Sequence, residues 1–525
     1  MPYGTDRAMK RGVAGALTLV ALLFASALPA GVATAASSPI RLRVMSFNIQ
    51  YGASLSPHGV RDVVRAIRAA DADVVGLQEP FGKTRRIARL LGWHAAPRLH
   101  MVSRFPFVFP DGSSVAGNPG GHIPQGVWGY LLLGDGNVAA VANTHTPSYP
   151  DGVKMMMQGA ARSDVLAVER RARVSWVQPH LDATATPIAG GIPTFFTGDF
   201  NSPSHLDWTP AAVKALGWQP PWIDPPGRRV PLRWPVTVAM ANAGYRDSYR
   251  EIHPDPVADP AFTWCVVTFP VCGKWRAWDR IDYVFDAGPV AAVRSQVVGE
   301  GGPYTDVASR PWPTDHRAVV STFDVTPVTP PAFAAPMDER VSLGRSARIA
   351  FHDAAAPGRT IGLWRSSADP ELDPPAVAGP VPAAAGDGTV GLDTSGLRQG
   401  RYTVAMLDNG GAEIARASLA VVNPRARATI ATSARRYARG EAITVNWTGG
   451  TGNRYDWLEL NRNCFDPTAC ALRQWRYIDG RVFGTARFNR GSTGIWPLRR
   501  GRYIVSLCVD DDYRCIATSA RFTIG

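Results

Sequence analysis

The period of the hydrophobic pattern changes along the first half of the chain. Residues 41–49 (RLRVMSFNI) alternate polar and apolar side chains as a β-strand does, whereas residues 60–70 space their apolar side chains along one face of a helix. Both patterns recur, with further strand-like segments at 73–78, 193–197 and 281–285 and a helical one at 163–177. This mixture predicts an α/β domain over residues 36–325.

A second region follows a proline-rich segment. Residues 326–336 (TPVTPPAFAAP) have the composition of a linker. Beyond it, the sequence LRQGRYTV at 397–404 returns as LRRGRYIV at 498–505, and strand-like segments surround both copies. We therefore expect two tandem all-β modules, 337–424 and 425–525, each an immunoglobulin-like sandwich.

The first residues have the features of a secretory signal peptide. Three basic residues, Arg7, Lys10 and Arg11, precede an apolar run that ends at the small residues 33–35 (ATA). This run is shorter than the roughly 20 residues that span a bilayer, and no later segment qualifies as a transmembrane helix. The sequence therefore predicts that residues 1–35 are removed, and we expect a secreted, monomeric protein.

The cysteines fit an exported protein. Their even number, six, favours disulfides over free thiols in an oxidising compartment. Proximity along the chain favours the pairs Cys265–Cys272, Cys464–Cys470 and Cys508–Cys515, while cross-pairing among the last four stays open. A structural zinc site is disfavoured, because the spacings lack the paired C-x2-C form.

Polar side chains gather at the ends of the predicted strands of the first domain. Strand ends can project groups into a common cleft, so these residues are candidates for chemistry. In chain order they are Asn48, Glu79, His145, Asp199, Asn201, Asp279, Asp282, Asp315 and His316. Their carboxylate and amide oxygens suit Mg²⁺ or Mn²⁺, with Ca²⁺ also possible, and the histidines and carboxylates could activate water near a phosphoryl group.

The motifs that carry these residues are SFN (46–48), LQEP (77–80), NTH (143–145), GDFN (198–201), DRID (279–282) and PTDH (313–316). In this order they resemble the endonuclease/exonuclease/phosphatase superfamily of metal-dependent phosphoesterases, from about Arg41 to Val325. The resemblance implies a four-layer α/β/β/α sandwich with its active site at one edge. It also implies that Asn48 and Glu79 bind a divalent metal, with Asp315 near it.

The same resemblance implies a role for the other residues. Asp199 would orient or deprotonate the attacking water, and Asn201 would position the water and the phosphate. His316 would contact the phosphate while Asp282 holds its ring. His145 would stabilise charge in the transition state or assist the leaving group.

Three assignments stay open. Asp279 and Asp282 lie three apart on one predicted strand and so face opposite sides, which means that only one can hold His316; we favour Asp282. Arg104, in the segment SRFP, could contact phosphate or be structural. The loop 110–125 contains no motif that we can interpret.

The sequence indicates the reaction more closely than the substrate. Export argues against soluble intracellular phosphoesters, and we expect a nuclease-type phosphodiesterase acting on nucleic acid. A sphingomyelin or phospholipid phosphodiesterase and a phosphomonoesterase are alternatives. A protein of another class, which binds surfaces through an inactive phosphoesterase-like domain, is disfavoured because the full set of polar residues is intact.

Composition and charge indicate a binding partner for the last part of the chain. Hydrophobic residues make up 45% of the chain and charged residues 19%, which excludes a disordered chain. Most of the formal net charge of +13 falls in residues 425–525, which hold 17 arginines against 8 acidic residues. We expect this module to bind a polyanion such as nucleic acid, a cell-wall polymer or an anionic membrane surface.

Overall fold

The structure is a computed structural model, and it describes residues 39–110, 128–216, 230–266, 279–352, 358–381, 386–462 and 472–525. The predicted signal peptide 1–35 and most of the loop 110–125 lie outside the described residues. Within the described ranges, no helix is both long and apolar enough to cross a membrane.

The first sheet of the N-terminal domain has β1 at its centre. Its strand order is β12-β11-β13-β1-β2-β4-β3. The strands are β1 (Ile40–Asn48), β2 (Val74–Gln78), β3 (His94–Ala96), β4 (Met101–Ser103), β11 (Val290–Gly299), β12 (Val307–Ala308) and β13 (Ala318–Val325). Leu42 and Val44 on one face of β1 and Met45 and Phe47 on the other are all fully buried. A strand buried on both faces belongs to the middle of a layered fold.

The second sheet has the order β5-β6-β7-β8-β10-β9. Its strands are β5 (Phe107–Val108), β6 (Gly129–Gly134), β7 (Asn137–His145), β8 (Thr194–Asp199), β9 (Arg246–Asp247) and β10 (Asp282–Ala287). Strands β7 and β8 are parallel, and β10 runs antiparallel to β8. Apolar side chains of both sheets, among them Val44, Val141 and Phe195, form one buried core between them.

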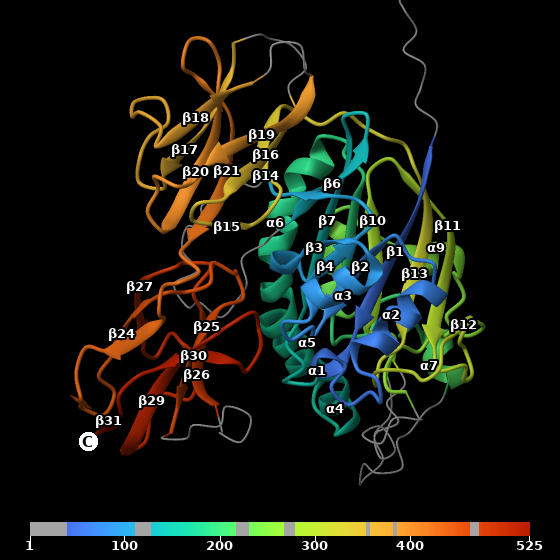
Figure 1. Cartoon of the computed structure of the whole chain (residues 1–525). Coiled ribbons are helices and arrows are strands. Elements are labelled where there is room, and N and C mark those ends of the chain that lie inside the picture. The colour runs from blue at the N-terminus through green and yellow to red at the C-terminus, as the bar shows by residue number, and fades with distance from the viewer. Residues whose placement is uncertain are drawn as a thin grey trace, which may run out of the picture. The chain divides into compact units, whose positions relative to one another are not determined.

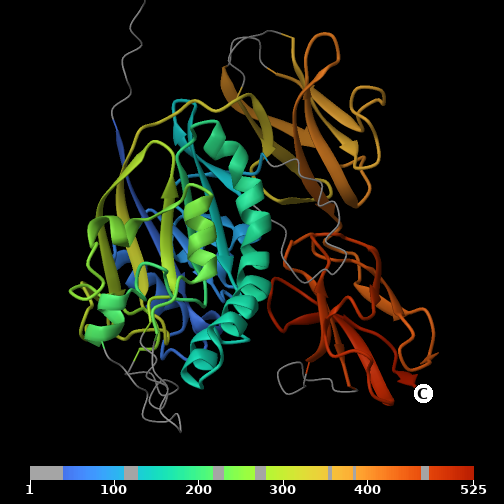
Figure 2. The same ribbon diagram turned by 180° about the vertical axis from the view of Figure 1, so that it is seen from behind.

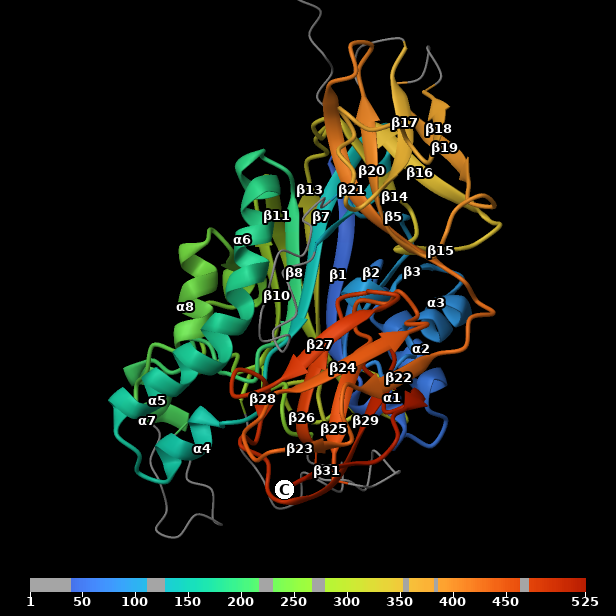
Figure 3. The same ribbon diagram turned by 90° about the vertical axis from the view of Figure 1, so that its left-hand side faces the viewer.

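Helices cover the outer face of each sheet. On the first sheet lie α2 (Val60–Ala69) and α3 (Thr84–Leu91), whose Val63 and Ile87 share an apolar cluster with Phe47 (Figure 1). On the second lie α6 (Ser175–Ala189) and α8 (Pro235–Asn242), and Figure 2 shows α6 running along that face. Viewed edge-on in Figure 3, the domain has the four layers α/β/β/α, which confirms the predicted fold.

Shorter helices connect these layers. They are α1 (Gln50–Ala53), α4 (Gly152–Met157), α5 (Arg162–Glu169), α7 (Pro210–Leu216) and α9 (Ser248–Ile252). A π-helical turn, Arg170–Val174, joins α5 to α6.

Two β-rich modules follow. The first pairs the sheets β14-β16-β19 and β15-β21-β20-β17-β18, and the second pairs β22-β24-β27 with β23-β31-β29-β25-β26-β28, where β30 also joins β29. The strands of the first are β14 (Phe333–Pro336), β15 (Arg340–Ser342), β16 (Ser346–His352), β17 (Thr360–Arg365), β18 (Val377–Pro380), β19 (Asp387–Asp393), β20 (Gly400–Leu407) and β21 (Glu413–Val422). Those of the second are β22 (Thr429–Thr432), β23 (Arg436–Tyr437), β24 (Ile443–Thr448), β25 (Trp457–Asn461), β26 (Leu472–Tyr477), β27 (Gly484–Phe488), β28 (Thr493–Gly494), β29 (Gly501–Cys508), β30 (Cys515–Thr518) and β31 (Phe522–Ile524).

The repeated sequence LRxGRY has the same structure in both modules. The hydroxyl of Tyr402 donates to the carbonyl of Arg398 at 2.8 Å, and that of Tyr503 donates to the carbonyl of Arg499 at 2.7 Å. Both tyrosine rings are buried. A tyrosine that ties its own strand to the preceding turn is a feature of immunoglobulin-like sandwiches, so the repeat marks a shared structural corner.

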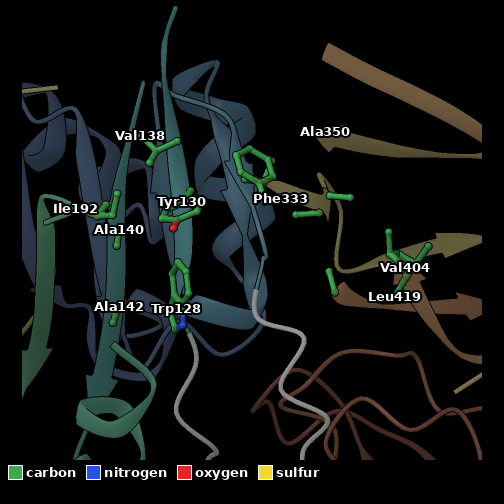
Figure 4. Close-up of a cluster of buried hydrophobic side chains, with 14 of the residues drawn as sticks. Trp128, Tyr130, Val138, Ala140, Ala142, Ile192, Phe333, Ala350, Val404 and Leu419 are labelled. Carbon is green, nitrogen blue, oxygen red and sulfur yellow. The ribbon is translucent and has the colours of Figure 1, made fainter. Parts of the chain in front are cut away.

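An apolar cluster links the second sheet to the first module. The ring of Tyr130 on β6 lies 5.8 Å from that of Phe333 on β14, between centroids, and Figure 4 shows both rings in one cluster. Strand β14 occupies the last four residues of the segment 326–336 and pairs with β16. Residues 38–525 therefore pack as a single compact unit.

One predicted disulfide is confirmed. Cys508 and Cys515 are bonded across the turn between β29 and β30. Cys265 is also disulfide-bonded, whereas Cys272, Cys464 and Cys470 lie outside the described residues.

Arg280 is a buried anchor directly before β10. Its guanidinium donates to Asp247 at 2.6 and 2.9 Å and to Asp207 at 3.1 Å, and it stacks over the ring of Tyr283. Replacing Arg280 with Met leaves the buried Asp247 without its ion-pair partner, while Asp207 keeps Arg250 at 2.6 Å, so we expect a loss of about 3–5 kcal/mol in the free energy of unfolding. Urea denaturation measures this loss.

The matched control for that substitution is Arg41→Met. The ion pair of Arg41 with Asp324 is largely exposed to solvent, and exposed pairs contribute only about 0–1 kcal/mol. Equal losses in the free energy of unfolding for the two substitutions would show that the buried network around Arg280 stabilises the fold no more than an exposed ion pair does.

Candidate active site

The alternation of side chains along the strands carries polar residues into the space between the two sheets. On β1, Leu42 and Val44 belong to the core between the sheets, and Asn48 ends the strand on that same face. The same spacing relates His145 to Val141 on β7, Asp199 to Phe195 on β8, and Asp282 to Val284 on β10. Register places His145 and Asp282 on either side of Asp199. The predicted residues therefore meet at one edge of the sandwich.

Asp199 is the centre of this group. Its Oδ2 accepts a hydrogen bond from Nδ2 of Asn48 at 2.9 Å, and Nε2 of His145 and of His316 lie 3.4 and 3.7 Å from the same oxygen. Its Oδ1 accepts the backbone N–H of Asn201 at 2.8 Å. Burial alone raises the pKa of Asp199, but the charges of His316 and His145 and the hydrogen bonds from His145 and the Asn201 backbone outweigh it and lower the pKa to about 2. The carboxylate is therefore ionised at neutral pH.

His316 is held by Asp282. Nδ1 of His316 lies 3.0 Å from Oδ2 of Asp282, which leaves Nε2 facing Asp199. Burial lowers the pKa of His316, but the charges of Asp282 and Asp199 outweigh burial and raise it to about 10. The hydroxyl of Thr263 accepts the backbone N–H of Asp282 at 3.2 Å and helps to fix this carboxylate. The ring is therefore an oriented cation at neutral pH.

Asp282→Asn should lower the pKa of His316 toward the ordinary value of about 6.5. The cause is the loss of the nearest negative charge, while burial continues to disfavour the charged ring. NMR titration of the imidazole resonances in metal-free protein measures the shift. An unchanged pKa in this variant would show that Asp282 does not set the charge of His316.

The two residues left open by the sequence lie elsewhere. Asp279 accepts a hydrogen bond from Nε1 of Trp208 at 3.1 Å instead of reaching His316. Arg104 pairs with Asp73 at 3.0 Å, before the first residue of β2. Since Glu79 follows the last residue of β2, Arg104 and Glu79 lie at opposite ends of that strand, and the structure does not bring Arg104 to the group.

A second set of oxygens lies beside Asp199. Oε2 of Glu79 accepts the backbone N–H of Tyr51 at 2.9 Å, and Oε1 lies 3.5 Å from Nδ2 of Asn48. Burial and the charge of Glu79 both raise the pKa of Asp315, although His316 opposes them. Glu79 and Asp315 are two carboxylates that repel each other, which suits a hard divalent cation. The amide of Asn48 turns its Nδ2 toward Glu79 and Asp199, and its Oδ1 accepts the backbone N–H of Gln50 at 3.0 Å, so the amide would have to rotate to offer its oxygen to a cation.

A different set of residues also meets the spacing of a metal site. Ligand atoms of Asp199, Asp282 and His316 lie within 4.8 Å of one another. Those three groups are already joined to one another, since Nδ1 of His316 lies 3.0 Å from Asp282 and its Nε2 lies 3.7 Å from Asp199. Asn48, Glu79 and Asp315 offer oxygen ligands alone, which suit a hard cation better than a set that includes an imidazole.

The local backbone supports this arrangement. Glu79 and Asn201 have φ values of +54° and +45°, a left-handed conformation that is uncommon for residues with a side chain. Such conformations persist where the surrounding structure enforces them, and they cluster at functional sites.

A buried polar network behind the site was not predicted. Nε2 of Gln78 donates to Oδ1 of Asn143 at 2.7 Å, and Nδ2 of Asn143 donates to the carbonyls of Leu77 and Leu99 at 3.0 Å each. The two sheets also approach closely here, because a Cβ on Gly76 of β2 would lie only 1.9 Å from the hydroxyl oxygen of Thr197 on β8. Glycine is therefore required at this position. The only sequence signal was the nearness of Gln78 to Glu79 and of Asn143 to His145. This network joins the two sheets directly beneath the site.

Comparison with known proteins identifies the family of the chain. Residues 45–316 match the endonuclease/exonuclease/phosphatase family. An uncharacterized protein of Caenorhabditis elegans is 26% identical over 337 residues, which cover 58% of this chain and 99% of that protein. The structure of an endonuclease/exonuclease/phosphatase from Beutenbergia cavernae shares 14% identity at a TM-score of 0.32, covering 72% of this chain and 99% of that one.

A second solved structure gives a similar result. Truncated TDP2 of Caenorhabditis elegans shares 18% identity at a TM-score of 0.32, covering 55% of this chain and 98% of that one. The family match includes every candidate residue from Asn48 to His316 and spans more than half of the chain. The chain therefore belongs to the endonuclease/exonuclease/phosphatase family, whose members are phosphoesterases and nucleases.

Proposed function

We propose that this protein is a secreted, divalent-metal-dependent phosphodiesterase. The observation that carries the proposal is the position of the Asp199 carboxylate, which is buried, ionised and approached by His145 and His316. A carboxylate held between two histidines can accept a proton from water while the imidazoles face the developing charge.

The residues present fit a divalent cation. Asn48, Glu79 and Asp315 would hold Mg²⁺ or Mn²⁺, and Ca²⁺ is also compatible with an oxygen donor set. When bound, the ion supplies positive charge that offsets the charge of the phosphate and its leaving oxygen.

Each of the other residues has a distinct task. Asp199 accepts the proton of the attacking water, and the side chain of Asn201 is fixed by a 2.9 Å hydrogen bond to the carbonyl of Thr146. His316, oriented by Asp282, presents its Nε2–H to a phosphate oxygen. His145, whose side chain is 32% exposed, can stabilise charge on the phosphate or assist the leaving group.

The substrate is identified by direct assay. The full mature chain is incubated with Mg²⁺, Mn²⁺ or Ca²⁺ and, separately, with bis(p-nitrophenyl) phosphate, plasmid DNA, RNA and sphingomyelin vesicles. We expect hydrolysis of at least the chromogenic diester, and we expect EDTA to stop it. Failure to hydrolyse any of these substrates with any of these ions would contradict the proposal, and it is also the result that an inactive, surface-binding protein predicts.

The last module is proposed to hold the protein on a polyanion. Arg435, Arg436 and Arg439 are exposed around β23. Replacing these three with Gln should lower the salt concentration at which the protein elutes from a heparin column, because each phosphate or sulfate contact adds to the salt dependence of binding. Arg61, Arg89 and Arg170, exposed on helices of the N-terminal domain, provide the matched triple control. Unchanged elution of the first variant would count against the assignment.

A further inference from the structure

The last module contains a cluster of aromatic side chains that the proposed reaction does not use. Its members, called the aromatic cage below, are Tyr455, Trp457, Trp475, Tyr477 and Tyr513. Tyr455, Trp457 and Tyr477 are buried, although the cluster lies apart from the main core of the module. The cluster is therefore a candidate for binding a ligand as well as for stabilising the module.

The rings of the cage stand at right angles to one another. Trp457 meets Trp475 at 88° and Tyr513 at 80°, and Tyr477 meets Trp475 at 79° and Tyr455 at 78°. A flat stacking platform for nucleobases needs exposed parallel faces. Perpendicular rings form the walls of a box, which is the arrangement that surrounds quaternary ammonium groups.

An acidic loop borders this box. Asp511 lines the same cavity, and its carboxylate accepts a hydrogen bond from the hydroxyl of Tyr477 at 2.9 Å. Asp510 and Asp512 flank it in the chain, and Asp510 and Asp511 both have left-handed φ values, +56° and +54°. Burial raises the pKa of Asp511, and a cation in the box would lower it again by stabilising the carboxylate. A carboxylate in this position favours a cation over the phosphates of a nucleic acid.

The box is part of a larger cavity that reaches the active site. This cavity has a volume of about 390 Å³ and is also lined by His145, Phe81, His100 and Trp176, which puts it within the range of about 300–1,000 Å³ typical of small-molecule pockets. The ring of Phe81 lies 6.0 Å from that of Tyr513, and His100 stacks on a ring of the cage, Tyr455, at 3.9 Å. His145 therefore faces both Asp199 and the cavity.

Two polar groups in the cavity wall lack a partner. Nε2 of His100, a residue that is only 6% exposed, and Nε1 of Trp176 form no hydrogen bond within the part of the chain that the structure describes. A polar group that is buried without a partner is costly unless a ligand satisfies it. Both residues line the cavity, and the two nitrogens lie buried in its wall, so a ligand oxygen would reach them only after the two rings turn toward the cavity.

We propose that the aromatic cage is a subsite for an alkylammonium group, so that the preferred substrate is a phosphodiester with a quaternary ammonium head such as choline. This inference rests on the proposed function in one respect, the hydrolysis of the phosphodiester bond. Binding of the cationic group to the cage does not depend on it. The phosphate lies at Asp199 and His316, and the choline arm passes His145 so that its cationic head enters the cage of the last module. Water attacks phosphorus, the P–O bond to the other alcohol breaks, and that alcohol leaves with a proton while choline stays esterified to the phosphate.

Binding is measured first, without catalysis. Choline chloride is titrated into the full mature chain while tryptophan fluorescence is followed, because Trp457 and Trp475 are in the cage. The neutral isostere 3,3-dimethylbutan-1-ol has the same shape without the charge, and we expect it to bind on the order of tenfold more weakly. The variant Asp199→Asn should bind choline as the unmodified protein does.

Variants of the cage locate the site. Trp475→Leu and Tyr513→Leu should each weaken choline binding about fivefold or more. The control is Phe483→Leu, an aromatic side chain of the same module that is 53% exposed and outside this cavity. Equal affinity of the cage variants and the unmodified protein for choline, or equal affinity for choline and its neutral isostere, would overturn the proposal.

Turnover then identifies the substrate. We expect a higher kcat/KM for p-nitrophenyl phosphorylcholine than for bis(p-nitrophenyl) phosphate, and loss of that preference in Trp475→Leu. Comparison of the soluble ester with sphingomyelin vesicles tells whether the head group comes from a small molecule or from a lipid.

Loss of oligonucleotide affinity in the cage variants, with choline affinity unchanged, would assign the cage to nucleic acid instead. Choline binding without hydrolysis of any ester would overturn the proposed function and leave the cage intact.

Discussion

Replacing Asp199 with Asn should lower kcat for bis(p-nitrophenyl) phosphate by about 10²–10⁴-fold, the usual contribution of a positioned general base. The substitution keeps the shape of the side chain but removes the negative charge on which Asn48, His145 and His316 converge. Steady-state kinetics with saturating Mn²⁺ measures the effect.

The control for this variant is Asp135→Asn, which changes an exposed carboxylate in the turn between β6 and β7. We expect it to keep full activity, and thermal unfolding should show that Asp199→Asn remains folded. If Asp199→Asn kept more than a tenth of the activity, the proton from water would have to go to another group.

Replacing His316 with Gln should lower kcat by about 10²–10³-fold with little change in KM, because a donor aimed at developing charge acts mainly in the transition state. Glutamine keeps a hydrogen-bonding side chain but cannot carry the positive charge that Asp282 and Asp199 stabilise on the ring. Comparison of kcat and KM over several substrate concentrations separates the two effects.

His94→Gln is the matched control for this substitution, since His94 is an exposed histidine on β3. It should leave both constants unchanged. A rise in KM alone in His316→Gln would mean that the ring binds the substrate without stabilising the transition state.

The periodicity of the sequence predicted the α/β class of the first domain, whereas the four-layer fold and the roles of the site residues followed from the family that the motifs resemble. One physical rule explains why those residues share a face. Side chains alternate along a strand, so Leu42 and Val44 of β1 fix the face on which Asn48 lies, and Val141 does the same for His145. The same rule showed that Asp279 and Asp282 cannot both face His316. It could not show which of the two does, because that depends on the neighbouring strand, where Asp199 pairs with Asp282.

Contacts between distant segments could not be predicted from the sequence. Arg104 was a candidate phosphate ligand, but its partner Asp73 is 31 positions earlier, at the other end of β2 from Glu79. The aromatic cage brings together side chains of β25 and the turn before it, of β26 and of the turn before β30, and no periodicity along the chain marks them as a group. Their nearness to His145 depends on how strands β25 and β26 and the turn before β30 pack against the N-terminal domain.

The central claim is a division of the site, in which Asn48, Glu79 and Asp315 hold the metal ion while Asp199, Asp282 and His316 act on the phosphate. Binding of Mn²⁺ to metal-free protein, followed by electron paramagnetic resonance, tests it most directly. We predict that Glu79→Gln weakens Mn²⁺ binding by about tenfold or more and that Asp282→Asn leaves it nearly unchanged. The reverse result, with Asp282→Asn losing the ion and Glu79→Gln retaining it, would place the metal among Asp199, Asp282 and His316 and contradict the account.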